Sequence, residues 1–235
     1  MSTADSIEVR TLPTGTQLRD GYVEAVCALT FGLFRLRDNA VAFGPVELLR
    51  FGKPKVTEHA VSWPIEGGIL SARPGGVLRV RAGKGRVEAT VSGWTPRLPG
   101  PIYALTQLRV HLLFTRLYLL RLRGREPAPG TRATTSERFD AAAVDVALCL
   151  SLARLFGRPR LRRALAIAAV YHVACWSIAG RTFGGLVMRQ RVVAVDGSRL
   201  TPAQALFRLA LLPASWIMRR PVQDELAATE VVIVD

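Results

Sequence analysis

The candidate functional residues of this sequence are ionisable side chains that lie inside apolar segments. Asp145 interrupts an apolar segment over residues 141–155. An ionised carboxylate in apolar surroundings is costly unless it is paired, so Asp145 should face a partner. Arg138 precedes it by two helical turns on the same face, and Arg154 and Arg208 are the other candidate partners.

A second acidic residue, Asp224, follows a pair of arginines near the C-terminus, and Arg219 and Arg220 are its candidate counter-ions. Charges in or beside a membrane have two uses. They form ion pairs that specify the fold, or they line a polar pathway for an ion or a small solute. We favour the ion pairs, because the domain that contains them is small.

Motifs for enzymatic chemistry or metal binding are absent from the sequence. It contains no phosphate-binding loop, dinucleotide fingerprint, zinc-protease, esterase or kinase motif. The histidines and cysteines are isolated in sequence: His59, His111, His172, Cys27, Cys149 and Cys175. Three cysteines without a CxxC pair predict buried free thiols in a reducing compartment, not a zinc site or a disulfide framework. We therefore predict no metal, no cofactor and no catalytic residue, and favour a non-enzymatic role.

Charge and hydropathy together restrict the class of protein. Lys and Arg number 32 against 18 Asp and Glu, a net charge of +14, yet 49% of the residues are hydrophobic. This combination fits a basic nucleic-acid binder or a membrane protein with arginine-rich flanks. The strongest basic runs, residues 155–163 and 218–220, lie beside apolar segments. We therefore expect an anionic phospholipid membrane as the partner, and no nucleic acid.

The chain divides at residues 124–137, a Pro-, Gly- and Thr-rich stretch without apolar periodicity that we interpret as a linker. Before it, residues 78–91 alternate apolar and polar side chains around a Gly-Lys-Gly turn. This pattern predicts an antiparallel hairpin with one face in water. Weaker patterns predict one helix and three further strands, over residues 20–33, 7–12, 41–51 and 55–63.

One long helix is predicted over residues 102–122, where Arg109, Arg116 and Arg123 recur every seven residues as a basic stripe. The helix either covers the sheet, with its stripe in water, or lies on an anionic bilayer, and we favour the first. Residues 1–123 are thus expected to form an α+β domain, an antiparallel sheet covered by a long helix. This order of elements resembles the START-like helix-grip fold, and the resemblance implies an apolar small ligand in this domain.

Three apolar segments follow the linker, over residues 141–155, 164–180 and 201–218. Each falls slightly short of the roughly 20 apolar residues that a spanning helix needs, but the middle one carries no formal charge. Trp176 and Trp216 lie near segment ends, as interfacial aromatic anchors do. We predict an all-α membrane domain of about three helices over residues 138–235. The alternative is a compact soluble three-helix bundle.

Polar and small residues recur in the C-terminal half in a defined order: Arg138, Ala141, Asp145, Thr182, Gly184, Arg191, Arg208, Asp224 and Thr229. In order and spacing they resemble the RDD family, a small membrane domain named for an arginine and two aspartates. The resemblance covers about residues 137–235 and implies a structural or transport role for these residues. Gly185 departs from the pattern, because the family usually has lysine there.

The sequence as a whole predicts an integral protein of the cell membrane. Its acidic, polar N-terminus has no secretory signal, so the N-terminal domain is expected in the cytoplasm. The predicted function is an RDD-like domain that holds a cytoplasmic α+β binding domain at the membrane. Small-solute or ion transport is a candidate second role, and a homo-oligomer is a candidate assembly. The alternative is a soluble helix-grip ligand-binding protein or enzyme with an accessory helical bundle.

Overall fold

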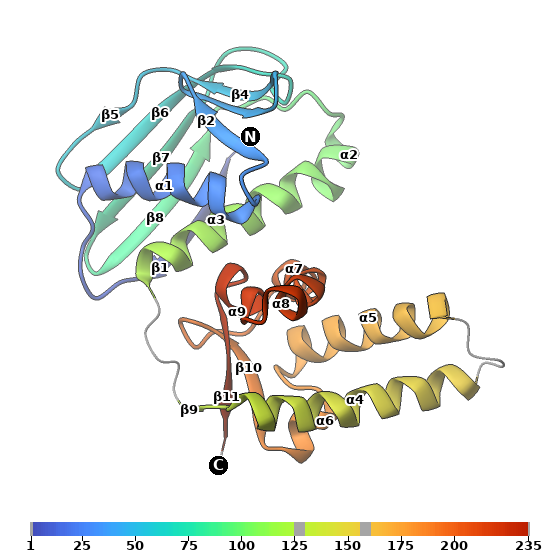
Figure 1. The fold of residues 1–235 in the computed structure, drawn as a ribbon. Coiled ribbons are helices and arrows are strands. Elements are labelled where there is room, and N and C mark those ends of the chain that lie inside the picture. The colour runs from blue at the N-terminus through green and yellow to red at the C-terminus, as the bar shows by residue number, and fades with distance from the viewer. Residues whose placement is uncertain (1, 125–129, 156–160, 235) are drawn as a thin grey trace. The chain divides into compact units, whose positions relative to one another are not determined.

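The computed structural model describes residues 2–124, 130–155 and 161–234. The chain forms two compact units, Met1–Gly124 and Arg125–Asp235. Both units contain helices and an antiparallel sheet (Figure 1).

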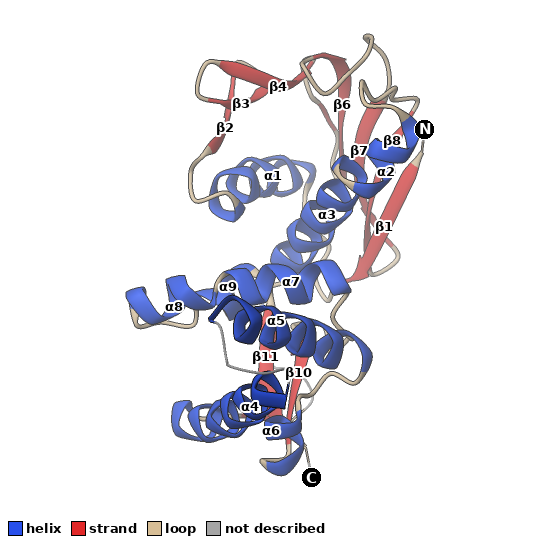
Figure 2. Cartoon of the chain, turned by 90° about the vertical axis from the view of Figure 1, so that its right-hand side faces the viewer, coloured by secondary structure: helices blue, strands red, loops and turns tan. Residues whose placement is uncertain are grey.

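The N-terminal unit is an antiparallel sheet with helices on one face. Its strands are β1 (Thr3–Glu8), β2 (Phe34–Arg37), β3 (Ala40–Phe43), β4 (Val46–Phe51), β5 (Lys55–Val56), β6 (Ala60–Gly67), β7 (Val77–Gly83) and β8 (Arg86–Ser92). Their order across the sheet is β1-β8-β7-β6-β4-β3-β2, and β5 pairs with β6. The helices are α1 (Gly15–Leu29), α2 (Gly100–Leu105) and α3 (Gln107–Arg123). Helices α1 and α3 lie over the same face of the sheet (Figure 2).

The predicted α+β architecture and its central hairpin are confirmed. In β7, Leu78, Val80 and Ala82 are buried, whereas Arg79 and Arg81 between them are exposed. The apolar face of the hairpin lies under the helices and its charged face is in water, as the alternating pattern requires.

Several element boundaries differ from those predicted. Residues 41–51 form two strands, β3 and β4, residues 55–63 are divided between β5 and β6, and β2 was not predicted. Strand β1 begins and ends earlier than residues 7–12, because it pairs along its length with β8 in a register that sets Ile7 opposite Val87. Helix α1 begins before the predicted start because Thr14 and Gln17 form a capping box. The Thr14 Oγ1 accepts from the Gln17 amide at 3.3 Å, and Gln17 Oε1 accepts from the Thr14 amide at 2.9 Å.

The helix predicted over residues 102–122 is interrupted at Thr106, whose φ and ψ of −118° and −84° separate α2 from α3. Helix α3 packs on β1 and β8 and so covers the sheet. Its basic stripe is not wholly in open water. Arg116 Nη1 lies 3.9 Å from Asp5 Oδ1 and 3.5 Å from the Ser6 carbonyl oxygen, contacts that hold α3 on β1.

Aromatic rings fill the space between the helices and the sheet. Tyr22 of α1 contacts the rings of Phe51, Trp63, Phe114 and Tyr118, with centroids 5.2 to 6.2 Å apart. The Tyr118 hydroxyl donates to the Leu18 carbonyl at 2.8 Å, which ties α3 to α1. The core of this unit therefore combines these aromatic contacts with fully buried aliphatic side chains, Leu18, Val61, Val80, Val87, Leu117, Leu119 and Leu120.

A small cavity lies under α3, between His111, Leu112 and Thr115 on the helix and residues of β1, β7 and β8. Its volume of about 10 Å³ is the space of roughly one water molecule. Thr3 Oγ1 of β1 lies 3.4 Å from His111 Nε2. The apolar ligand implied by the helix-grip resemblance stays a prediction.

The C-terminal unit combines helices with a small sheet. Its elements are β9 (Thr131–Arg132), α4 (Thr135–Leu155), α5 (Leu161–Ile178), α6 (Phe183–Val187), β10 (Gln190–Ala194), α7 (Pro202–Ala210), α8 (Leu212–Met218), α9 (Val222–Leu226) and β11 (Thr229–Ile233). The strands pair antiparallel in the order β10-β11-β9. The prediction of an all-α domain was therefore wrong. Strands β10 and β11 are far apart in sequence, so neither shows the short-range pattern of a hairpin.

The three predicted apolar segments all contain helix, but the third is divided. Residues 201–218 form α7 and α8, and Pro213 lies in the first turn of α8, where it cannot continue the hydrogen-bond ladder of α7. Strand β9 and the first turn of α4 fall within the stretch predicted as linker, of which residues 125–129 lie outside the described residues. Among the helices that the structure describes, none combines the length and apolarity needed to cross a bilayer.

Candidate functional site

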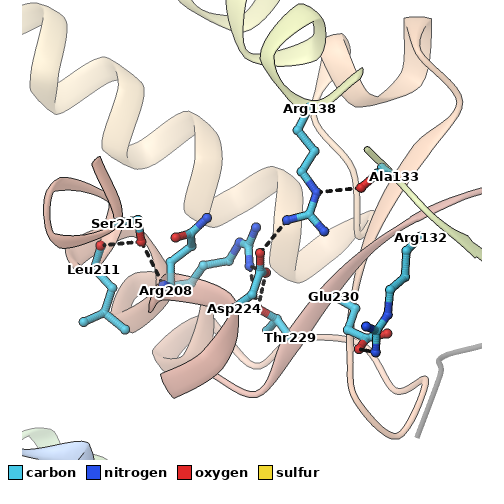
Figure 3. Close-up of polar contacts among 10 residues, drawn as sticks. Arg132, Ala133, Arg138, Arg208, Leu211, Ser215, Asp224, Thr229 and Glu230 are labelled. Carbon is cyan, nitrogen blue, oxygen red and sulfur yellow. Dashed lines mark hydrogen bonds and ion pairs between the residues drawn. The ribbon is translucent and has the colours of Figure 1, made fainter. Parts of the chain in front are cut away.

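Four of the predicted site residues meet in one buried ionic cluster: Arg138 of α4, Arg208 of α7, Asp224 of α9 and Thr229 of β11 (Figure 3). Arg138 Nη1 donates to Asp224 Oδ2 at 2.7 Å, and its Nε donates to the Ala133 carbonyl at 3.1 Å. Arg208 Nη1 donates to both Asp224 Oδ1 and Thr229 Oγ1. The Thr229 hydroxyl donates to Asp224 Oδ1 at 3.0 Å. The cluster thereby joins α4, at the start of the C-terminal unit, to α7, α9 and β11 near the end of the chain.

The partners of Asp224 differ from those predicted. Its counter-ions are Arg138 and Arg208, which lie on two other helices, and not the adjacent Arg219 and Arg220. Arg219 and Arg220 are exposed at the end of α8, whereas Asp224 is buried. Proximity in sequence did not identify the partners of Asp224, because α9 places its carboxylate in the interior of the unit.

The electrostatics of the cluster keep Asp224 ionised. Burial by itself raises the pKa of this carboxyl, but attraction to Arg208 and Arg138 and the hydrogen bonds from Arg208 and Thr229 outweigh it. The pKa of Asp224 is therefore below its usual value. Arg208 is also buried, and its guanidinium carbon lies 5.1 Å from the centroid of the Trp176 ring, a cation–π contact.

Asp145 occupies a second polar cluster, between α4, α5 and α6. Its Oδ1 accepts from the Tyr171 hydroxyl at 2.7 Å and from the Gly184 amide at 2.8 Å, and its Oδ2 lies 3.9 Å from His172 Nε2. The Tyr171 hydroxyl in turn accepts from the Phe183 amide at 2.7 Å. The expectation of an arginine partner was wrong, because Asp224 takes Arg138 and Arg208, and hydroxyl and amide donors satisfy Asp145.

Thr182 and Gly184 shape the turn that contacts Asp145. Thr182 Oγ1 accepts from the Gly185 amide at 3.1 Å and caps α6. A Cβ atom at Gly184 would lie 2.0 Å from the Ala141 carbonyl oxygen and 3.0 Å from Asp145 Cγ. Glycine is therefore required at position 184 for α6 to approach α4. At Gly185, where the resembled family has lysine, a Cβ would lie 3.2 Å from the Gln190 carbonyl oxygen.

Arg191, the remaining predicted site residue, is brought into neither cluster. It lies on β10, and its buried Nε has no hydrogen-bond acceptor among the described residues. A Cβ at Gly180 would lie 2.9 Å from that nitrogen, so the arginine side chain passes over a glycine. The structure thus places Arg191 in the packing between β10 and the end of α5.

Sequence reasoning missed the roles of two residues that complete these clusters and of a third that supports the packing of α7. Tyr171 is an aromatic residue in an apolar segment, where core packing is the ordinary role, but its hydroxyl donates to Asp145. Trp176 was expected as an interfacial anchor, and the structure instead buries it against Arg208. Gln204 is buried and donates to the Ala227 carbonyl at 2.7 Å, which ties α7 to the end of α9. The sequence did contain a signal for Gln204, because it is a polar residue inside the apolar segment over residues 201–218.

The chemistry of the two clusters is ion pairing and hydrogen bonding within the fold. In the ionic cluster, both oxygens of Asp224 already accept hydrogen bonds from buried or half-buried donors. Such an arrangement fixes helices in register and leaves no free carboxylate oxygen for a substrate. Within the described residues, no group of three or more His, Cys, Asp or Glu side chains is placed to hold a metal ion.

Comparison with known proteins finds that part of the C-terminal unit is similar to one family. Residues 163–229 match the model of the RDD family. This match confirms the family resemblance of the C-terminal half over a shorter range than the sequence motifs indicated. It includes Thr182, Arg208 and Asp224 but not Arg138 or Asp145, which the structure nevertheless joins to the matched region. No curated protein and no solved structure gives a significant match to the chain.

Proposed function

We propose that the C-terminal unit attaches this protein to a membrane and holds the N-terminal α+β unit at the membrane surface. Two findings support the proposal. Residues 163–229 match the RDD family, whose domains are typically membrane-associated. In addition, α4 and α5 expose apolar side chains over much of their length, and this exposure is the observation that carries the proposal.

The buried face of α4 is narrow and its exposed face is apolar. Ala141, Asp145, Cys149 and Ala153 recur every fourth residue and form the buried stripe. The other faces of α4 and α5 expose large apolar residues: Val146, Leu150, Leu155, Leu161, Leu165, Val170 and Ile178. A helix that packs in water normally carries polar residues opposite its buried stripe.

Exposed apolar surface of this extent has a free-energy cost in water. Val146 of α4 is 56% exposed and Val170 of α5 is 71% exposed. Burial of one such side chain contributes on the order of 1.5–3 kcal/mol, and contiguous exposed apolar patches mark interaction surfaces. Because these residues lie on two adjacent helices, hydrocarbon is a medium that could cover them together.

The ionic cluster has a structural role in this proposal. Arg138 and Arg208 converge on Asp224 and fasten α4 and α7 to α9. Because Arg138 lies near the start of α4, the cluster fixes that end of the helix against α9 and β11. With this end fixed, α4 and the adjacent α5 present their apolar faces as one surface.

Flotation tests membrane attachment directly. Full-length protein mixed with phospholipid vesicles beneath a density gradient should rise with the vesicles. Protein from lysed cells should likewise sediment with the membrane fraction in the absence of detergent. Protein that stays at the bottom of the gradient and in the soluble fraction would refute attachment and favour a soluble ligand-binding protein or enzyme.

A matched pair of variants locates the attachment surface. Val146→Ser combined with Leu150→Ser should lower vesicle affinity about ten-fold or more, because each loses apolar area worth roughly 1.5–3 kcal/mol on burial. Leu105→Ser combined with Val110→Ser changes two exposed residues of the N-terminal unit and should leave flotation unchanged. The opposite result would place the attachment surface on α2 and α3. The cytoplasmic location of the N-terminal unit and a homo-oligomeric state stay predictions from the sequence.

A further inference from the structure

The end of α8 exposes a cluster of apolar and basic side chains that the ionic clusters do not use. Trp216, Ile217 and Met218 are 77%, 82% and 50% exposed. The two residues that follow, Arg219 and Arg220, are also exposed. We call residues 216–220 the α8 tip.

The α8 tip is held outward by the residue that precedes it. Ser215 is buried, its hydroxyl donates to the Leu211 carbonyl at 3.2 Å, and it accepts from the Gln223 amide at 3.0 Å. These bonds fix α8 against the start of α9. Three consecutive helical residues point in three directions about 100° apart, so their common exposure means that the helix projects beyond its packing partners.

The charge of the tip is favourable for an anionic surface. Arg219 ends α8 in the left-handed conformation at φ 50°, a conformation that glycine would adopt at lower cost. Arg220 Nη2 lies 3.6 Å from Glu225 Oε2, and the Arg220 side chain is exposed while that of Glu225 is partly exposed. Such a surface pair is weak, so Arg220 can exchange it for another anion.

A similar arrangement recurs at α6. Leu186 and Val187 are exposed at the end of that helix, and Met188 and Arg189 follow. Arg189, like Arg219, adopts a left-handed conformation, at φ 52°. Two short helices of this unit thus end in exposed apolar residues followed by Met-Arg.

We propose that the α8 tip docks on the headgroup region of an anionic phospholipid bilayer. The Trp216, Ile217 and Met218 side chains enter the boundary between headgroups and acyl chains, and Arg219 and Arg220 contact lipid phosphates. Tryptophan is enriched at this depth because its ring is amphipathic, and each arginine near an anionic membrane surface contributes on the order of 1 kcal/mol. The inference rests on the membrane attachment proposed above and adds the lipid class and a second contact point.

Depth-dependent quenching of tryptophan fluorescence tests the docking. Full-length protein is bound to vesicles of phosphatidylcholine with phosphatidylglycerol, with and without brominated acyl chains. The other tryptophans, Trp63, Trp94 and Trp176, are buried, so Trp216 is the residue that bromine should quench. Quenching should be strong in the wild type and mostly lost in Trp216→Phe. Equal quenching in both proteins, or none in the wild type while it floats with the vesicles, would overturn the docking.

Charge variants test the choice of lipid. Arg219→Gln combined with Arg220→Gln should weaken binding to anionic vesicles by roughly ten-fold or more, and binding to pure phosphatidylcholine should change little. Arg181→Gln combined with Arg199→Gln removes the same charge from two other exposed positions of the unit and should have a smaller effect. If both pairs weaken binding equally, only the net charge matters and the tip has no specific role.

The two proposals fail in different ways. A wild-type protein that does not float with any vesicle refutes membrane attachment itself. A wild-type protein that floats, but whose Trp216 is not quenched and whose tip arginines can be replaced without effect, retains attachment through α4 and α5 and loses the α8 docking.

Discussion

At the scale of residues, the organising feature of the C-terminal unit is one carboxylate shared by two arginines. Asp224 is buried and accepts hydrogen bonds from Arg138, Arg208 and Thr229. Removing one member of a buried ion pair leaves the other charge uncompensated, which costs far more than the pair contributes. Asp224 is therefore the position where a small change should have the largest effect.

Asp224→Asn should destabilise the C-terminal unit by about 3–5 kcal/mol, because the two arginines keep their charge and lose their counter-ion. Thermal unfolding of the full-length protein measures the effect as a lowered Tm. Glu225→Gln is the control, since this neighbour is partly exposed and pairs loosely with Arg220. Equal Tm values for Asp224→Asn and the wild type would show that the cluster contributes little to stability.

The partly buried imidazole of His111 should make the stability of the N-terminal unit depend on pH. Burial between α3 and the sheet lowers the pKa of this imidazole from 6.5, so the unfolded chain binds the proton more readily than the folded one. Stability is then complete above about pH 6.5 and falls as the pH decreases through this value towards the lower folded pKa. His111→Gln should reduce the loss of Tm between about pH 8 and 5.5. An unchanged loss would assign the pH dependence to other groups.

At the scale of elements, the close approach of α6 to α4 depends on a single glycine. A helix of five residues has little stability of its own, and α6 is held by the Thr182 cap and by the bond from the Gly184 amide to Asp145. The contact leaves no room for a side chain at position 184. Helix α6 is thus positioned by contact of its backbone with α4. Such a contact leaves no hydrophobic periodicity in the sequence from which it could be predicted.

Gly184→Ala should separate α6 from α4 and weaken the bond to Asp145, because the added Cβ would lie 2.0 Å from the Ala141 carbonyl oxygen. We expect a destabilisation of about 1–3 kcal/mol, measured as a lower Tm of the full-length protein. Gly185→Ala is the matched control, since its Cβ meets its nearest neighbour at 3.2 Å and requires a smaller adjustment. A milder effect at 184 than at 185 would contradict the close packing of these two helices.

At the scale of the whole molecule, the hydrophobic pattern and the charged residues of the sequence predicted the main features of both units. Alternation over residues 78–91 predicted the β7–β8 hairpin, and continuous apolar runs located α4 and α5. The motif order in the C-terminal half indicated the family that residues 163–229 match. These features follow from local periodicity and composition, which act over a few residues and can be read directly from the chain.

The small sheet and the pairing of charges depended on the tertiary structure. Strand β11 pairs with β10 and β9, and Asp224 selects Arg138, 86 residues earlier, over the adjacent Arg219. The sequence determined which residues carry charge and which segments are apolar. Only the folded chain decided which charges meet, because a buried ion pair forms where packing brings two groups together and excludes water, whatever their separation along the chain.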